Sequence, residues 1–270
     1  MSRLGLEAEM WKCRNASVLR RAYVHLVGWC FLGGWLRLRE IEKELGRHDL
    51  LPRLILDAGC GPGENSLFLA RRFPMAQITA VDWEATESFR GHLDQLRNLV
   101  ADRGISNVSV RKQNLLELNE TARYDLILNV DVLEHIPENR KVLAAFHKAL
   151  RPGGVVVMHM PARGRPAKSR LFPYPVLKAL EEEHIGDMYR AHELQTALES
   201  MGFERVSVTT TFHWFAQTAW EWDKICYHAA PVLYPLLLPL LKALGWLDLY
   251  LKLDRGFGLL AVARRPGKGG

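Results

Sequence analysis

The sequence predicts an α/β fold with a mostly parallel sheet and helices on both faces. Three observations carry this prediction. From residue 54 onward, short apolar segments alternate with amphipathic segments of helical length, which is the pattern of repeated βαβ units. A glycine-rich turn joins the first expected strand to the first expected helix, and an aspartate ends the second strand. Both features are typical of ligand sites in open α/β sheets.

The expected elements follow from the periodicity of apolar residues along the chain. Strands are expected near residues 53–58, 77–82, 107–112, 124–129, 154–160, 203–211 and 257–264. Helices are expected near 63–73, 86–103, 138–150 and 190–201. The segment 161–189 is rich in proline, glycine and charge and is expected to be an active-site loop.

Two segments stand outside this alternation. Residues 1–48 read as an N-terminal helical cap that ends near Gly46, a typical helix stop. Residues 49–270 form the main domain, which carries a helical, apolar insertion at 212–253 between its last two strands. We expect the cap and the insertion to cover a substrate site together.

Composition narrows the classes of partner and compartment. The chain has 270 residues and a net charge of +6, a mild excess of base without a nucleic-acid motif, so no nucleic-acid partner is expected. Its four cysteines include no CxxC pair, which favours a reducing, cytoplasmic setting without zinc. Apolar stretches at 22–36 and 229–241 are shorter than the ~20 residues of a spanning helix. They are expected to be buried helices or peripheral contacts with a membrane surface.

The glycine turn is the strongest single signal. Asp57 is followed by Gly59, Gly61 and Gly63 and then by a helix. Glycines in such a turn let the backbone approach a ligand closely, and the helix start adds unpaired N–H groups. The spacing is GxGxG and not the GxGxxG of dinucleotide sites. A carboxylate at Asp57 would repel a pyrophosphate, but it suits the cationic end of a ligand that carries an amino acid.

The second strand ends in Asp82, followed by Trp83. An acidic side chain at this place reaches ribose hydroxyls, and its oxygens can accept from both of them. Trp83 could lie against an adenine ring. The alternative is a helix-capping aspartate beside a core tryptophan.

Four motifs stand in order along the chain: DAGCGPGEN, VDWE, YDLILNVDVLEHIPE and LRPGG. Together they resemble the class I S-adenosylmethionine-dependent methyltransferases, in particular the type 11 and ubiquinone-biosynthesis O-methyltransferase-like members. The resemblance implies a Rossmann-like sheet of seven strands in the order 3-2-1-4-5-7-6, with the seventh antiparallel, so that 49–270 is the methyltransferase domain. It also implies that S-adenosyl-L-methionine is the cofactor, that the three glycines line its methionine moiety and that Asp82 binds its ribose.

The third motif departs from the family pattern. Where the family usually has an aspartate that accepts from the adenine amino group, this chain has Asn114, whose amide oxygen can still accept. The resemblance implies that the Leu115 N–H meets the adenine ring. It also places the backbone of Asn129 against the methionine or reacting end.

Candidates for acid–base chemistry lie in the run NVDVLEHIP. Asp131, Glu134 and His135 are spaced i, i+3 and i+4 and would share one face of a helix. A base is needed only if the acceptor is protonated, and His135 with Glu134 would then be the catalytic residues. The alternative is that these three residues only cap a helix and pack around the loop. Similarity to the ubiquinone-biosynthesis enzymes adds a divalent cation on the same three residues as an option, but no resident metal is expected.

Other polar residues near the expected cleft have ordinary surface or packing roles as their first interpretation. His159 ends the fifth strand, and His184, Tyr189 and Arg190 precede the helix near 190–201. Arg190 could also help to hold the substrate, since similar methyltransferases carry a histidine and an arginine near this helix.

The composition of the cap indicates the kind of acceptor. Its insertion is crowded with aromatic residues: Trp214, Trp220, Trp222, Tyr227, Tyr234 and Trp246. Such aromatic surface with little charge suits a small hydrophobic or lipid-like acceptor, or contact with a membrane; a helical layer that simply covers the sheet is the alternative. An active methyltransferase is therefore the first hypothesis. The second is a non-catalytic, S-adenosylmethionine-binding partner subunit of the same fold, and an NAD-dependent oxidoreductase is disfavoured by the missing GxGxxG.

Overall fold

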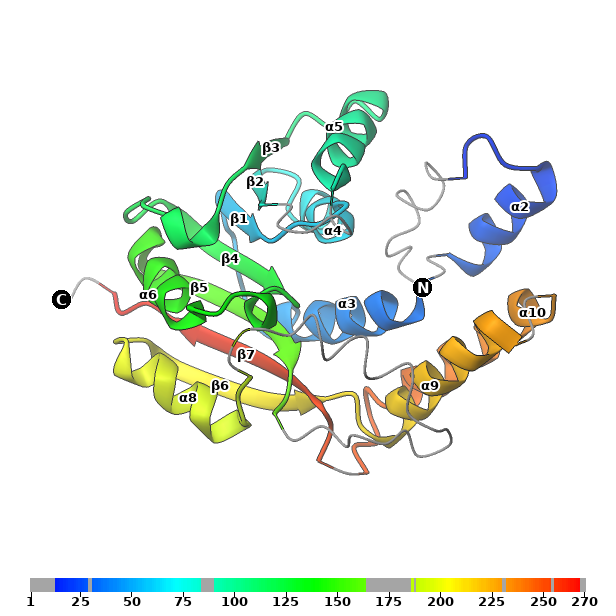
Figure 1. Ribbon diagram of the computed structural model, residues 1–270. Helices are drawn as coiled ribbons and strands as arrows, with labels where there is room; N and C mark the ends of the chain where they lie inside the picture. The colour runs from blue at the N-terminus through cyan, green and yellow to red at the C-terminus, as the bar shows by residue number, and fades with distance from the viewer. Residues whose placement is uncertain are drawn as a thin grey trace.

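The structure is a computed structural model and describes residues 13–28, 31–83, 90–163, 186, 188–229, 232–253 and 255–267. A twisted sheet forms its middle layer, helices cover both faces, and a helical group projects from one end (Figure 1). The expected active-site loop at 161–189 falls mainly outside the described residues, and so does His184.

The sheet confirms the fold prediction. Seven strands run in the order β3-β2-β1-β4-β5-β7-β6. Only β7 is antiparallel to its neighbours β5 and β6. The strands are β1 Leu54–Ala58, β2 Gln77–Asp82, β3 Val108–Lys112, β4 Tyr124–Val130, β5 Leu150–Pro161, β6 Glu204–Thr211 and β7 Gly258–Arg264. The observed β5 begins four residues before the expected strand, because Leu150 already pairs with Tyr124 ahead of a register shift.

Helices cover both faces because the central strands are apolar on both sides. One face packs against α3 Leu32–Leu45, α4 Glu64–Arg72 and α5 His92–Asp102. The other face packs against α6 Asn139–Ala149 and α8 Ala191–Ser200. Helix α5 begins later than the expected start at residue 86, since Gly91 in the left-handed region precedes it. Two short 3₁₀ turns, η2 Leu115–Glu117 and η3 Leu133–His135, follow β3 and β4.

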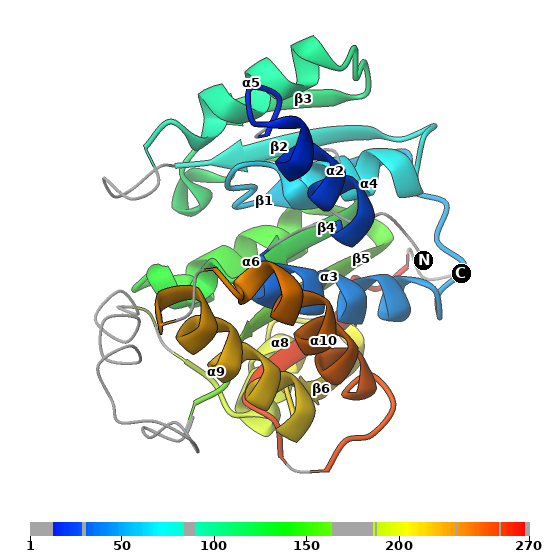
Figure 2. The ribbon, with the colours of Figure 1, turned by 90° about the vertical axis from the view of Figure 1, so that its right-hand side faces the viewer.

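The remaining helices come from both ends of the chain. They are α2 Val18–Val27, α9 Trp214–Ala229 and α10 Tyr234–Leu247, the last two in the expected insertion, and they lie together beside α3 (Figure 2). The Tyr23 hydroxyl donates to the Pro235 carbonyl at 2.7 Å. Gly245 allows a close crossing, because a Cβ there would lie 2.7 Å from a methyl of Leu36. None of the described helices has the length and apolar character needed to cross a bilayer.

Helix α3 packs against the sheet and also against the helices that project from it. Its residues Leu36, Leu38 and Ile41 are buried in the same apolar cluster as the sheet, and its beginning contacts α9, where Gly33 lies against Trp220. The helices α2, α3, α9 and α10 are called the cap below. The division of the chain into a cap at 1–48 and a domain at 49–270 stays a prediction.

Candidate functional site

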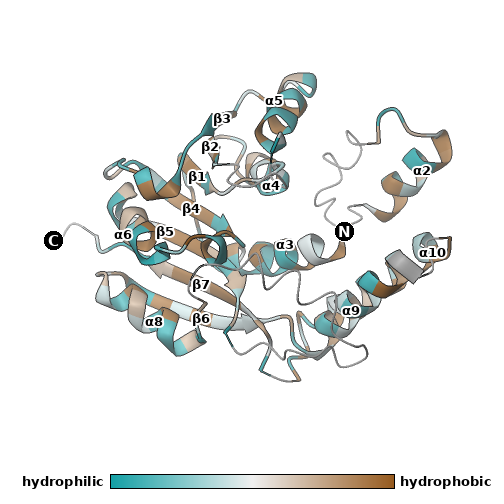
Figure 3. Cartoon of the chain, viewed as in Figure 1, coloured by the Kyte–Doolittle hydropathy of each residue, from teal (hydrophilic) through white to brown (hydrophobic). Residues whose placement is uncertain are grey.

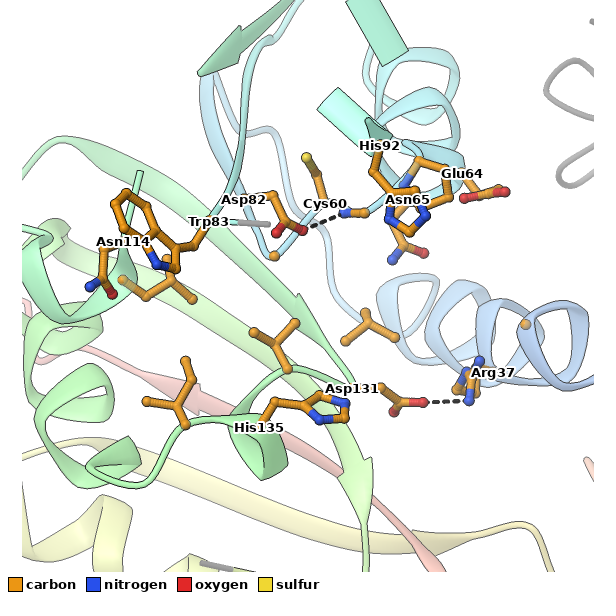
Figure 4. Close-up of a pocket in the computed structure, with 18 of the residues that line it drawn as sticks. Arg37, Cys60, Glu64, Asn65, Asp82, Trp83, His92, Asn114, Asp131 and His135 are labelled. Carbon is orange, nitrogen blue, oxygen red and sulfur yellow. Dashed lines mark hydrogen bonds and ion pairs between the residues drawn. The ribbon is translucent and has the colours of Figure 1, made fainter. Parts of the chain in front are cut away.

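A cavity of about 660 Å³ opens at the carboxyl ends of β1, β2, β3 and β4. This is the place where open α/β sheets bind ligands. Its first wall is the glycine loop after β1 and the ends of β2 and β3; its second wall is the segment 130–137 and the beginning of α3 (Figure 4). The cap therefore borders the same space as the glycine loop.

The three glycines of the loop all have positive φ, but they do different work. A Cβ on Gly59 would lie 2.2 Å from Val132 Cγ2, and one on Gly63 would lie 2.2 Å from Leu96 Cδ1. These two glycines let the loop pack closely against its neighbours. Gly61 has φ +50 and no heavy atom within 4 Å of a Cβ position, and it lines the cavity. Gly61 therefore leaves open the space that a ligand would occupy.

Asp82 joins the two halves of the first wall. Its Oδ2 accepts a hydrogen bond from the Gly61 N–H at 2.8 Å, and the residue lines the cavity. Trp83 also lines the cavity and is half exposed, with the Lys112 ammonium 5.5 Å from its ring centroid. The alternative of a tryptophan buried in the core does not hold, since the ring is open to a ligand.

Asp57 and Asn129 lie behind the loop and not in its lining. Both are fully buried. Ser66 donates to Asp57 Oδ2 at 2.5 Å, whereas no described residue donates to Asp57 Oδ1. Asn129 Nδ2 donates to the Ala58 carbonyl at 2.7 Å, and its Oδ1 also lacks a donor within the described part of the chain. Burial raises the pKa of Asp57 to about 7, although the Ser66 hydroxyl opposes this shift.

Asn114 and Leu115 lie at the start of η2 and line the cavity. The Asn114 Oδ1 accepts from the Leu116 N–H at 3.0 Å and so caps this turn. The amide oxygen that we expected to meet an adenine amino group therefore already has one structural partner, and only its second lone pair remains for a ligand.

The run from Asp131 to His135 is not the α-helix that the i, i+3, i+4 spacing presumes. Asp131 has φ +51, and Leu133–His135 is a single 3₁₀ turn. Asp131 and His135 line the cavity, whereas Glu134 is buried and stands outside the lining. A left-handed residue at the end of β4 turns the chain sharply, so the three side chains do not share a face. Within the described residues, no group of three histidine, cysteine or acidic side chains is arranged to hold a metal ion.

Asp131 instead belongs to a network that sequence reasoning missed. It forms an ion pair with Arg37 of α3, and its Oδ1 lies 2.7 Å from Nδ1 of the buried His159. The His159 Nε2 lies 3.0 Å from the Thr211 hydroxyl on β6. Burial alone would raise the pKa of Asp131, but Arg37 and His159 lower it to about 2. The carboxylate is thus ionised at neutral pH and ties the cap to the sheet.

The other predicted residues have structural partners. The Tyr189 hydroxyl donates to Asn139 Oδ1 at 2.6 Å in a buried position. The Arg190 N–H donates to Glu193 Oε2 at 2.8 Å at the start of α8. The packing interpretation fits the described geometry of both residues. His159 also has a structural environment, but it lies directly behind a residue of the cavity wall.

Known proteins are similar to this chain over its central part. A family model described as a methyltransferase domain matches residues 36–208. The trans-aconitate 2-methyltransferase of Deinococcus radiodurans is 32% identical over 117 residues, 43% of this chain and 41% of that protein. The ubiquinone biosynthesis O-methyltransferase of Leptothrix cholodnii is 33% identical over 125 residues, 46% of this chain and 49% of that protein. The chain thus spans about half the length of these two relatives.

Solved structures share the fold at low identity. Phosphoethanolamine N-methyltransferase 2 of Haemonchus contortus, in complex with phosphomonomethylethanolamine and S-adenosylhomocysteine, has a TM-score of 0.63 and 18% identity and covers 98% of this chain and 61% of that one. A geranyl diphosphate methyltransferase in complex with S-adenosylmethionine has a TM-score of 0.54 and 17% identity, with 79% and 78% covered. A [4+2]-cyclase also shares the fold at a TM-score of 0.53, with 18% identity and 80% and 76% covered, so the fold alone does not fix the reaction.

The family model covers well over half of the chain and includes the glycine loop, Asp82 and the run around Asp131. It agrees with the observed strand order and with the motifs that the sequence presents. The chain therefore belongs to the class I S-adenosylmethionine-dependent methyltransferases.

Proposed function

We propose that the protein transfers a methyl group from S-adenosyl-L-methionine to a small hydrophobic or lipid-like acceptor. One observation carries this proposal: the glycine loop and the cap line a single cavity. A donor bound at the loop and an acceptor held under α3 would share this space, as an in-line displacement requires.

The first wall fits the cofactor in chemistry and in space. Gly61 leaves a backbone cradle that a Cβ would fill. Asp57 Oδ1 and Asn129 Oδ1 are buried acceptors that receive no hydrogen bond from the residues the structure describes, which suits a cationic amino acid moiety nearby. The Asp82 carboxylate can accept from ribose hydroxyls in addition to the Gly61 N–H, and the exposed ring of Trp83 offers an adenine a stacking face.

The second wall suits an apolar acceptor. Phe31, Val132, Ile136 and Pro137 line it. Arg37 also lies there, but it is already paired with Asp131. A free carboxylate acceptor, of the kind that the name trans-aconitate 2-methyltransferase specifies for several relatives, would have to compete with Asp131 for this guanidinium. We therefore favour a largely apolar acceptor over a polyanionic one.

The bound cofactor supplies the methyl group as a sulfonium, and the chain positions the acceptor and excludes water. His135 lines the cavity and is our candidate for accepting a proton from an acceptor hydroxyl. Asp131 is a poor base because its pKa is lowered to about 2. Glu134 is buried behind the lining, where it can support the turn that holds His135 without touching the acceptor.

The proposal is tested in two measurements. Calorimetric titration should give S-adenosylmethionine binding that falls at least tenfold in affinity for Asp82→Ala and is unchanged for Asp49→Ala, an exposed aspartate remote from the lining. Incubation with cofactor and a set of hydrophobic hydroxyl compounds, followed by mass spectrometry, should show a methylated product. Turnover should fall about 10²-fold in His135→Ala with unchanged cofactor affinity.

Two results would contradict the proposal. No binding at millimolar cofactor would remove the donor site. Binding without a methylated product from any hydrophobic acceptor would favour the non-catalytic partner subunit.

A further inference from the structure

The outward face of α10 is apolar along its whole length. Leu236 is 73% exposed and Leu240 66%, and the other exposed residues of the same stretch carry no charge. These residues are Val232, Leu233, Pro235, Pro239, Ala243, Trp246, Leu247, Tyr250 and Leu251. A surface helix normally keeps its apolar stripe inward and polar residues outward. Helix α10 is apolar on both sides, because Leu238 and Leu241 are buried in the main apolar cluster while Leu236 and Leu240 are exposed.

The charged residues of the same stretch point inward and are used there. Lys242 is buried, and its ammonium donates to the Val27 carbonyl at 2.9 Å. Asp248 is buried and accepts from the backbone N–H groups of His213 and Ala216 at the start of α9. The outer face of this stretch is therefore left without charge, because both of its charged side chains are used in the packing of the cap.

Helix α2 extends this apolar face. Leu19 is 83% exposed and Leu26 85%. The helix is held beside α10 by the bond from Tyr23 to Pro235 and by Lys242, which reaches the end of α2. Both helices contain hydrophobic residues (Figure 3), and several of these are exposed. We define the docking face as the exposed apolar residues of α2 and of the stretch 232–251.

Among the described residues, the exposed charges around the docking face are cationic. They stand before and on α2 and after α10: Arg14, Arg20, Arg21, Lys252 and Arg255. The acidic residues within 13–28 and 213–253 are Glu221, Asp223 and Asp248, and all three are buried. An apolar face whose described surroundings carry exposed cations and only buried acids is complementary to an anionic bilayer surface. Two copies that met through this face would bring cation against cation, which disfavours self-association.

We propose that the docking face binds the surface of an anionic membrane, with its leucines in the interfacial region and its arginines at the headgroups. This inference rests on the proposed function in one respect, because it identifies the bilayer as the source of the apolar acceptor. Helix α3 contacts both parts: Phe31 at its start lines the cavity, and Leu36 packs closely against Gly245 of α10. An acceptor that leaves the bilayer at the cap is thus delivered next to the cavity.

The test is sedimentation of the full chain with vesicles of phosphatidylcholine alone or with 30% phosphatidylglycerol, where 30% is roughly a physiological anionic fraction. We expect binding to the anionic vesicles and about a tenfold weaker partition to the neutral ones. In the double variant Leu236→Glu, Leu240→Glu, the partition to anionic vesicles should fall at least tenfold. The double variant Arg20→Ala, Arg21→Ala should bind anionic vesicles more weakly, and its partition to neutral vesicles should not change.

A matched control is Met75→Glu, which adds a charge at a 91% exposed apolar residue between α4 and β2. It should sediment like the unaltered protein. Unaltered cofactor affinity by calorimetry shows that each variant is folded and keeps the donor site, so loss of vesicle binding is read separately from failure of the proposed activity. Equal vesicle binding by the glutamate variant overturns the proposal. The proposal is also overturned if the unaltered protein does not bind anionic vesicles. This includes the case in which size-exclusion chromatography shows a dimer that the glutamate substitutions dissociate.

Discussion

The two walls of the cavity are held in place by contacts that differ greatly in their separation along the sequence. In the glycine-loop wall, Gly61 and Asp82 are 21 residues apart and meet through a backbone N–H. In the cap, which reaches the second wall through α3, α2 is fastened to α10 by bonds that join residues 212 and 215 positions apart. The first wall depends on a few residue types at fixed spacing, whereas the second depends on apolar packing between the two ends of the chain. Substitutions should therefore act sharply and locally in the first wall and more broadly in the second.

The largest expected effect separates two glycines of the first wall. Gly59→Ala should lower the free energy of unfolding by about 4 kcal/mol, because its Cβ overlaps Val132 and its φ of +84 disfavours a side chain. Gly61→Ala should cost only about 1 kcal/mol, since its Cβ meets open space, yet it should weaken cofactor binding. Urea unfolding and calorimetric titration measure the two quantities.

Two results would contradict this comparison of Gly59 with Gly61. If Gly61→Ala binds the cofactor as the unaltered protein does, the space beside Gly61 is not where the cofactor lies. If both variants unfold at the same urea concentration, the close approach of Gly59 to Val132 does not control the loop.

A second prediction uses the buried carboxyl behind the loop. Burial raises the pKa of Asp57 to about 7, above its ordinary value in the unfolded chain. The folded state then holds a proton that the unfolded chain has lost, so the stability from this group is complete below about pH 4 and is lost as pH rises to 7. The loss is about 3 kcal/mol between pH 4 and pH 7. Unfolding of Asp57→Asn measured across this range should lack that decline.

The third prediction tests the tie between the cap and the sheet. Arg37 and His159 hold the pKa of Asp131 at about 2, below its value in the unfolded chain. The sign is therefore opposite to that of Asp57: the stability is present above about pH 4 and is lost as pH falls to 2, by about 2 kcal/mol. Asp131→Asn should flatten this part of the acid unfolding curve. Glu138→Gln, an exposed acid paired only with Lys141 in the described structure, serves as the control and should keep it.

The same difference in reach explains what the sequence could predict. All seven strands and the positions of the glycine loop and Asp82 follow from local periodicity and short motifs. The strand order was implied by the resemblance to the class I methyltransferases and is confirmed by the sheet. The network of Arg37, Asp131, His159 and Thr211 was missed because its members come from four distant segments and none has an unusual neighbour in sequence. The left-handed turn at Asp131 also broke the helical spacing that assigned Glu134 to the cavity.

For a related reason, the sequence left open whether the apolar stretch of α10 is a buried helix or lies at a surface. A run of leucines and prolines predicts an apolar helix, but it does not say which side is buried. Only the inward use of Lys242 and Asp248, each bonded to backbone far away in the chain, fixes that choice. Packing between the two ends of the chain, and not the composition of the insertion, therefore decides which side of the cap faces outward.

The smallest expected effect concerns the one motif that departs from the family pattern. Asn114 caps η2 through Oδ1, so Asn114→Ala should lower the free energy of unfolding by about 1 kcal/mol. Asn114→Asp keeps an oxygen for the cap and should restore that stability. If an adenine amino group also reaches this oxygen, the aspartate variant should bind S-adenosylmethionine at least as tightly as the unaltered protein, and the alanine variant about fivefold more weakly. Equal affinity in all three proteins would limit Asn114 to capping and leave recognition of the adenine to Trp83 and the backbone at Leu115.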